Sequence, residues 1–145
     1  MTISISSRRA VLLAALALLT FVPPTVAGNP QKIRISGTWA ATLVHNQLQG
    51  TRTGVASPGG PVNGVFVGKQ IKGTATGIGM LDFGNGDTLT YEFEASFVSS
   101  NLLVGTWVVT GGTGKYIGAA GSGTSFATTP GDGTGDFEYT GSISF

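Results

Sequence analysis

The chain has 145 residues, with eight Lys and Arg, seven Asp and Glu, one histidine and no cysteine. The absence of cysteine excludes disulfides, lipoprotein anchoring and thiolate metal sites, and a single histidine, His45, excludes a histidine-based metal cluster. The near-balanced charge gives no support for nucleic acid or an anionic membrane as partner. We therefore expect no metal, no cofactor and no nucleic-acid partner.

The first 27 residues have the layout of a secretory signal peptide. The pair Arg8–Arg9 precedes an almost unbroken apolar run from Ala10 to Val22, and Thr25 and Ala27 are the small residues that favour cleavage after Ala27. The apolar run is short of the roughly 20 residues that cross a bilayer core. We expect export to the periplasm or medium with no membrane span after cleavage, by the general secretory route or, given the paired arginines, the twin-arginine route. A retained N-terminal anchor is the alternative.

Residues 28–145 are then a single domain that is large enough to bury its own core. Cleavage leaves six basic and seven acidic residues, so the net charge of this domain is −1. All 24 glycines of the chain lie in it, which is about a fifth of its residues against a usual ~7%. Glycine-rich composition without helical periodicity favours an all-β domain.

Apolar and polar residues alternate along this domain with the period of a β-strand. From Lys32 to Leu43 the odd-numbered positions are apolar or glycine, as expected of a strand with one buried face. The same odd-numbered alternation is predicted from Val65 to Phe83, from Leu89 to Phe97 and from Phe137 to Phe145. Leu102–Thr110 is apolar at both its odd-numbered and its even-numbered positions, which predicts a strand covered on both faces.

Turn signals separate these strands. Gly84–Asp87 contains Asn-Gly and predicts a hairpin turn. Residues 45–61 lack alternation and are predicted to form a long loop with room for a short strand, and residues 128–135 form another loop. Six to eight strands joined by short turns predict a closed antiparallel β-barrel of about eight strands, calycin-like in architecture. Inward glycines, expected at 37, 73, 77, 79, 105 and 141, let strands coil, and neighbouring aromatic rings cover their bare backbone.

The segment VVTGGTGKYIG, residues 108–118, resembles a phosphate-binding loop but lacks the rest of a nucleotide site. Gly118, Gly121 and Gly123 weaken any following helix by ~1 kcal/mol each. No βαβ unit follows, and Lys115 is followed by tyrosine rather than Ser or Thr. The sequence predicts instead a glycine turn, a tucked-in Tyr116 and a return strand, with no bound nucleotide.

The segment TGGTGKYIGAAGSGT, from Thr110, resembles that of bacterial exported proteins with the allene oxide cyclase-like barrel, and is similar to the GGTGxF turn of dirigent proteins. The preceding Gly105-Thr106-Trp107, the Asn85–Asp87 hairpin and the Gly73–Gly77 strand fit the same pattern. The resemblance extends over residues 32–145. It implies an eight-stranded antiparallel barrel that holds apolar ligands or reactive intermediates in its interior. It also implies chemistry without cofactors, in some members through a carboxylate in an apolar pocket.

Parity argues against such a carboxylate here, because Asp82, Glu92, Glu94 and Glu138 lie on even positions and should face solvent. A β-bulge beside Glu92 and Glu94 would reverse their orientation and turn them inward. His45 is expected at the rim. Inward polar groups are then Tyr91, Tyr139 and Lys69, and no catalytic residue is assigned.

Five aromatic residues share the inward parity and are the candidate ligand-binding residues: Trp39, Tyr91, Phe93, Trp107 and Tyr139. They either fill the core or line a pocket opened by the inward glycines. The first functional hypothesis is an exported barrel that binds a small apolar or aromatic ligand. One alternative is a cofactor-free isomerase or cyclase, or a dirigent-like protein, for which an ionisable group with a strongly shifted pKa deep in the pocket would be the mark. The other alternative is a structural surface protein. The apolarity of Leu102–Thr110 also suggests a homo-oligomer.

Overall fold

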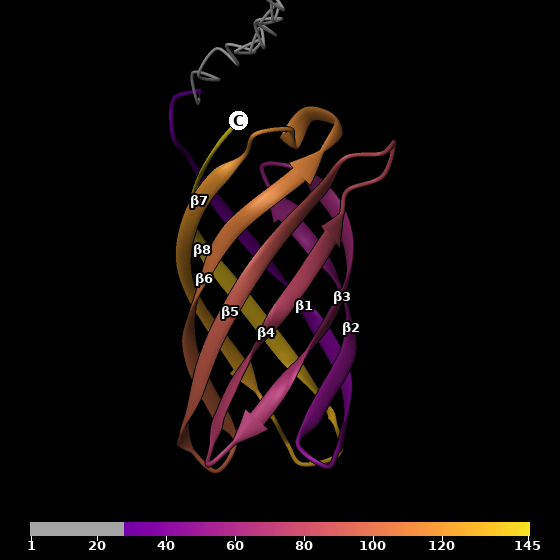
Figure 1. The fold of residues 1–145 in the computed structure, drawn as a ribbon, viewed down its shortest axis with the longest axis vertical. Helices are drawn as coiled ribbons and strands as arrows, with labels where there is room; N and C mark the ends of the chain where they lie inside the picture. The colour runs from indigo at the N-terminus through magenta and orange to yellow at the C-terminus, as the bar shows by residue number, and fades with distance from the viewer. Residues whose placement is uncertain (1–27) are drawn as a thin grey trace, which may run out of the picture.

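Residues 28–145 of the computed structural model form a closed barrel of eight antiparallel strands in chain order (Figure 1). The expected signal peptide lies outside these described residues. The strands are β1 Gln31–Val44, β2 Gln47–Ser57, β3 Gly60–Ile71, β4 Thr74–Asp82, β5 Thr88–Ser99, β6 Leu102–Thr113, β7 Ala120–Thr128 and β8 Thr134–Ser144. The described part has no helix that is long and apolar enough to span a membrane. The expected fold class is confirmed.

Pairing between the first and last strands closes the barrel. Each strand pairs with the next along the chain, and β1 pairs with β8 from Gln31↔Ile143 to Ala40↔Thr134. Every strand therefore has a partner on both sides, and the sheet presents no free edge for pairing with another chain.

Strand β2 corrects the expectation of a long loop over residues 45–61. A two-residue turn, His45-Asn46, joins β1 to β2, and both residues have positive φ, as a type I′ hairpin turn requires. In such a turn odd-numbered residues pair with even ones, for example Leu43 with Leu48. The inward face therefore changes from odd to even positions, and β2 keeps the even face.

A second turn of the same kind restores the original parity. Lys72 and Gly73 also have positive φ and join β3 to β4. Between the two turns the even positions of β3 face inward, so the expected inward Val65 and Lys69 lie on the outer wall instead. Gly73 belongs to the turn rather than to the inward set.

An irregularity in the pairing of β5 with β6 leaves the acidic residues facing solvent. Thr90 pairs with Gly111 and Tyr91 with Val109, so Thr110 is the extra residue of a bulge on β6. This bulge is on β6, and a second irregularity, at Val98 of β5, comes only after Phe97, so the alternation of β5 is preserved from Thr88 to Phe97. Glu92 and Glu94 are exposed, as their parity predicts.

Strand β6 is not covered on both faces in the described structure, contrary to expectation. Leu103, Trp107 and Val109 point inward and are buried. Val108 points outward and is 51% exposed. The outer face of this strand is apolar but open.

The glycine-rich segment after β6 closes one end of the barrel. Gly114–Tyr116 forms a single 3₁₀ turn, and Gly114 has φ +60°, which favours glycine. The Tyr116 side chain is buried, and its ring centroid lies 4.8 Å from that of Phe83 and 4.9 Å from that of Phe145. The expected turn, tucked-in tyrosine and return strand are confirmed.

Candidate functional site

A cavity of about 90 Å³ lies inside the barrel. It reaches the end formed by the β1–β2, β3–β4 and β5–β6 turns and the β7–β8 loop, which is the lower end in Figure 1. The Tyr116 turn is at the opposite end. The walls are mainly apolar and the polar lining residues are few: Trp39, Ala41, Leu48, Arg52, Phe66, Gln70, Ala75, Phe93, Ala95, Phe97, Leu103, Ser125, Ala127, Thr129 and Tyr139.

Arg52 places a positive charge inside the barrel. It lies in the middle of β2, where it pairs with Trp39 on β1 and Gly64 on β3, and its even position faces inward. Its Nη1 donates a hydrogen bond to the Tyr91 hydroxyl. Its Nε is buried and has no hydrogen-bond acceptor.

Five aromatic rings surround the guanidinium. The distances from its Cζ to the ring centroids are 4.4 Å for Phe66, 4.8 Å for Tyr139, 5.3 Å for Phe137, 5.7 Å for Phe93 and 5.8 Å for Tyr91. Ring faces attract a cation electrostatically and are worth about 0.5 to 2 kcal/mol each. The rings have no lone pairs like those of a carboxylate oxygen. These five rings therefore stabilise the positive charge but do not neutralise it.

No carboxylate accompanies Arg52 in the interior. All seven acidic residues of the chain lie on the outer wall or in turns. The ion pairs of the described residues join Arg34 to Glu138 and Lys115 to Asp87, both away from the cavity. A cation left in an apolar interior without a counter-ion is unusual and costly.

Two tyrosines adjoin the guanidinium and remain neutral at ordinary pH. Burial raises the pKa of Tyr91 and raises that of Tyr139 well above its ordinary value, although the nearby Arg52 charge opposes both shifts. Their ring centroids are 5.6 Å apart in an edge-on arrangement. Protonated hydroxyls beside a guanidinium provide hydrogen-bond donors rather than a base.

The five residues expected to bind a ligand all face inward, but they divide into two groups. Trp39, Phe93 and Tyr139 line the cavity. Tyr91 and Trp107 are buried behind it, and the Trp107 ring stacks on Tyr139 at 6.1 Å with an interplanar angle of 18°. Each indole is fixed by its N–H, which donates to a backbone carbonyl at 3.1 Å, Thr128 for Trp39 and Thr124 for Trp107.

The sequence-based prediction missed Arg52 and Phe66. Arg52 lies in the stretch taken for a loop, and Phe66 lies on the parity taken for the outer face. Residues 48–56 do alternate, with Leu48, Gly50, Arg52, Gly54 and Ala56 on one face. The signal was present, but an arginine and two glycines among five inward positions do not look like a buried face.

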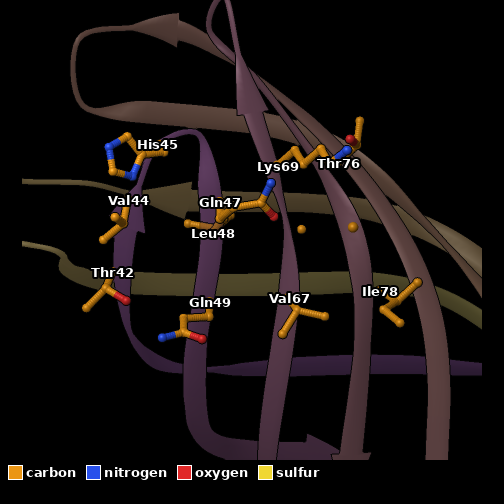
Figure 2. Close-up of a pocket in the computed structure, with 12 residues that line it drawn as sticks. Thr42, Val44, His45, Gln47, Leu48, Gln49, Val67, Lys69, Thr76 and Ile78 are labelled. Carbon is orange, nitrogen blue, oxygen red and sulfur yellow. The ribbon is translucent and has the colours of Figure 1, made fainter.

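A larger hollow of about 690 Å³ lies on the outer wall, across β1 to β4 (Figure 2). Figure 2 shows His45, Gln47 and Lys69 toward one end and Thr42 and Ile78 toward the other. Its side chains come mainly from the outward positions of the strands, and His45 is an exposed turn residue, as expected. The hollow lies open on the outer wall, whereas the cavity lies inside the barrel, so the cavity is the better candidate site.

None of the family models, curated proteins or solved structures compared with the chain matches it. Within residues 28–145, no three His, Asp or Glu side chains come together where they could hold a metal ion. The fold and cavity define a small closed β-barrel with an apolar, aromatic-lined interior that contains one cationic group.

Proposed function

We propose that this chain is an exported β-barrel protein that binds a small apolar or aromatic molecule in its interior cavity. The observation that supports this function best is the cavity itself, whose aromatic and aliphatic walls lead to a polar group with an unused donor. Ligand sites are typically concave and mainly apolar, with a few polar groups that fix orientation. A partly buried arginine without a carboxylate partner costs free energy of folding, so stability alone does not explain why it lies at this place.

The binding function is tested by comparing two variants of neighbouring residues on β1. Ala41 lines the cavity, whereas Ala40 points outward and is exposed. Ala41→Phe is expected to fill the cavity and abolish ligand-induced changes in Trp39 fluorescence, whereas Ala40→Phe leaves them unchanged. Native mass spectrometry of the protein purified from its own host identifies the ligand class. A bare chain that gives no fluorescence change with any apolar probe contradicts the proposal.

Export is part of the proposal, and it rests on the N-terminal sequence pattern. N-terminal sequencing of the protein recovered from periplasm or medium is expected to begin at Gly28. Replacing Arg8 and Arg9 by lysine distinguishes the routes, because only twin-arginine transport depends on the arginine pair. Recovery of the chain only in the cell membrane with Met1 still attached contradicts cleavage.

A cofactor-free isomerase or cyclase is a second candidate function, favoured by the position of Tyr139. The resemblance to allene oxide cyclase-like and dirigent proteins suggested this class. Tyr139 lines the cavity, and its raised pKa keeps its hydroxyl protonated beside Arg52. These donors would stabilise negative charge that develops on a ligand oxygen, without abstracting a proton. Turnover of a bound molecule that is lost in Tyr139→Phe, while binding is kept, supports this candidate.

A structural role in an oligomer is a third candidate, favoured by one outer patch. Val65 pairs with Met80, and Val67 with Ile78, across β3 and β4, and all four side chains are exposed. Light scattering of the purified protein measures its mass in solution. A monomer at all accessible concentrations removes the homo-oligomer expected from the sequence.

A further inference from the structure

The guanidinium of Arg52 has more hydrogen-bond donors than the protein satisfies. Nη1 donates to the Tyr91 hydroxyl, but Nε has no acceptor. No carboxylate of the described residues comes within 4.0 Å of it. The faces of the aromatic rings attract the positive charge. They do not accept the remaining N–H hydrogen bonds of the guanidinium as the two oxygens of a carboxylate would. The interior is therefore preorganised for an anion that comes from outside the chain.

We propose that the ligand of the cavity is a small monocarboxylate, whose carboxylate binds Arg52 and whose apolar part extends toward the open end of the barrel. This inference rests on the proposed binding function and names its ligand class. Arg52 and Tyr139 both line the cavity, so a carboxylate at its inner end meets a guanidinium and a phenolic hydroxyl together. Guanidinium and carboxylate are both planar and match in a two-point hydrogen bond.

Charge balance favours a carboxylate over a phosphate group. The interior contains one cation, and the two tyrosines beside it stay neutral because burial raises their pKa values. A monoanion is neutralised by one guanidinium. A phosphate dianion would leave one negative charge uncompensated among aromatic rings, which is strongly unfavourable.

The walls and volume define the rest of the ligand. Beyond Arg52 the lining consists mainly of Trp39, Leu48, Phe93, Phe97 and Leu103, and these side chains favour a hydrocarbon chain or an aromatic ring. The cavity volume of about 90 Å³ is the volume that roughly three water molecules occupy in liquid water. The ligand is therefore short, with any longer tail lying at the open end beside Gln70 and Thr129.

The test compares each acid with its neutral amide of the same shape. The protein recovered after expression of the full chain is titrated calorimetrically with acids short enough for the cavity and their amides, propionate and propionamide and then butyrate and butyramide, and with inorganic phosphate. Wild type is expected to bind each acid about 10- to 100-fold more tightly than its amide, as a charge-assisted hydrogen bond implies. Arg52→Gln is expected to remove this preference. Arg34→Gln, which removes an exposed arginine of the outer wall, keeps it.

The outcomes separate the two proposals. Equal affinity for acid and amide overturns the carboxylate inference while the binding function stands. Failure of all organic probes to bind wild type overturns the binding function as well. Phosphate that binds as tightly as the acids shows a general anion site and also overturns the inference. If Arg52→Gln does not fold, Arg52→Met is measured instead, because methionine removes the charge and fills similar space among the rings. A preference that is unchanged in either variant overturns the inference.

Discussion

Gly79 lies directly opposite Tyr91 across the β4–β5 pair, and the Tyr91 ring occupies the space where a Gly79 side chain would be. The same arrangement recurs around the barrel, where an inward ring covers the glycine it pairs with. The other pairs are Gly50 with Phe66, Gly77 with Phe93, Gly123 with Trp107 and Gly135 with Trp39. The glycines thus make room for aromatic rings, and four of these five rings surround Arg52 or line the cavity.

Gly79→Ala is therefore expected to destabilise the barrel by about 1 to 3 kcal/mol, the usual cost of overpacking a core. The added methyl group overlaps the Tyr91 ring, which is buried among other side chains of the core. Gly111→Ala is the control, because a Cβ there meets only the Thr90 Oγ1 at 3.4 Å. Denaturant unfolding measures both variants. Equal midpoints for the two would show that Tyr91 has freedom to move.

Arg52→Met is expected to leave stability within about 1 kcal/mol of wild type or to raise it. The substitution removes a partly buried charge that has no carboxylate partner, and methionine fills similar space among the rings. Thermal unfolding of the ligand-free protein measures the difference. A loss of several kcal/mol would show that Arg52 holds the barrel together and is not retained mainly for a ligand.

Tyrosine ionisation is expected to begin above its ordinary range in the folded protein. Burial raises the pKa values of all three tyrosines, Tyr91, Tyr116 and Tyr139. Because the folded pKa values exceed the unfolded value near 10, the unfolded chain loses these protons first. Stability is then complete below about pH 10 and falls as the pH rises above it. Near-ultraviolet phenolate absorbance should show a higher midpoint in native than in denatured protein; coincident midpoints contradict the burial.

Glu92→Gln and Glu94→Gln are expected to change stability by no more than about 0.5 kcal/mol each, the usual range for exposed sites. Both carboxylates point outward from β5 and are exposed. Binding of small probes in the cavity should also be unaffected. Thermal unfolding and the Trp39 fluorescence titration check the two expectations. Lost binding in either variant would mean that the carboxylate reaches the interior, against the observed alternation.

Periodicity in the sequence was sufficient to predict the barrel but not the orientation of every strand. The predicted odd-numbered face is correct for β1, β4, β5 and β8 and for β6 as far as its bulge. The predicted inward face is wrong for β3, and β2 was not recognised as a strand. Each two-residue turn, at 45–46 and at 72–73, pairs odd-numbered with even-numbered residues and so exchanges the positions that face inward. His-Asn and Lys-Gly are weaker turn signals than Asn-Gly.

The candidate site was predicted in part for the same reason. Trp39, Phe93 and Tyr139 lie on strands whose parity was right, and they line the cavity. Arg52 lies on the strand that was missed, and only the three-dimensional neighbours of its guanidinium distinguish it from an exposed loop arginine. A charged residue in a glycine-rich strand carries no local mark of burial, since its surroundings come from β3, β5 and β8.

Both ends of the described chain meet beside the Tyr116 turn, with Gly28 close to the backbone of Phe145 (Figure 1). The cavity reaches the far end of the barrel, a whole strand length away. A fluorescent tag, an affinity handle or a solid support joined at Phe145 would therefore leave the route for small molecules clear. On the proposed binding function, the barrel would be suited to immobilisation as a sensor, with the open end of its cavity turned away from the support.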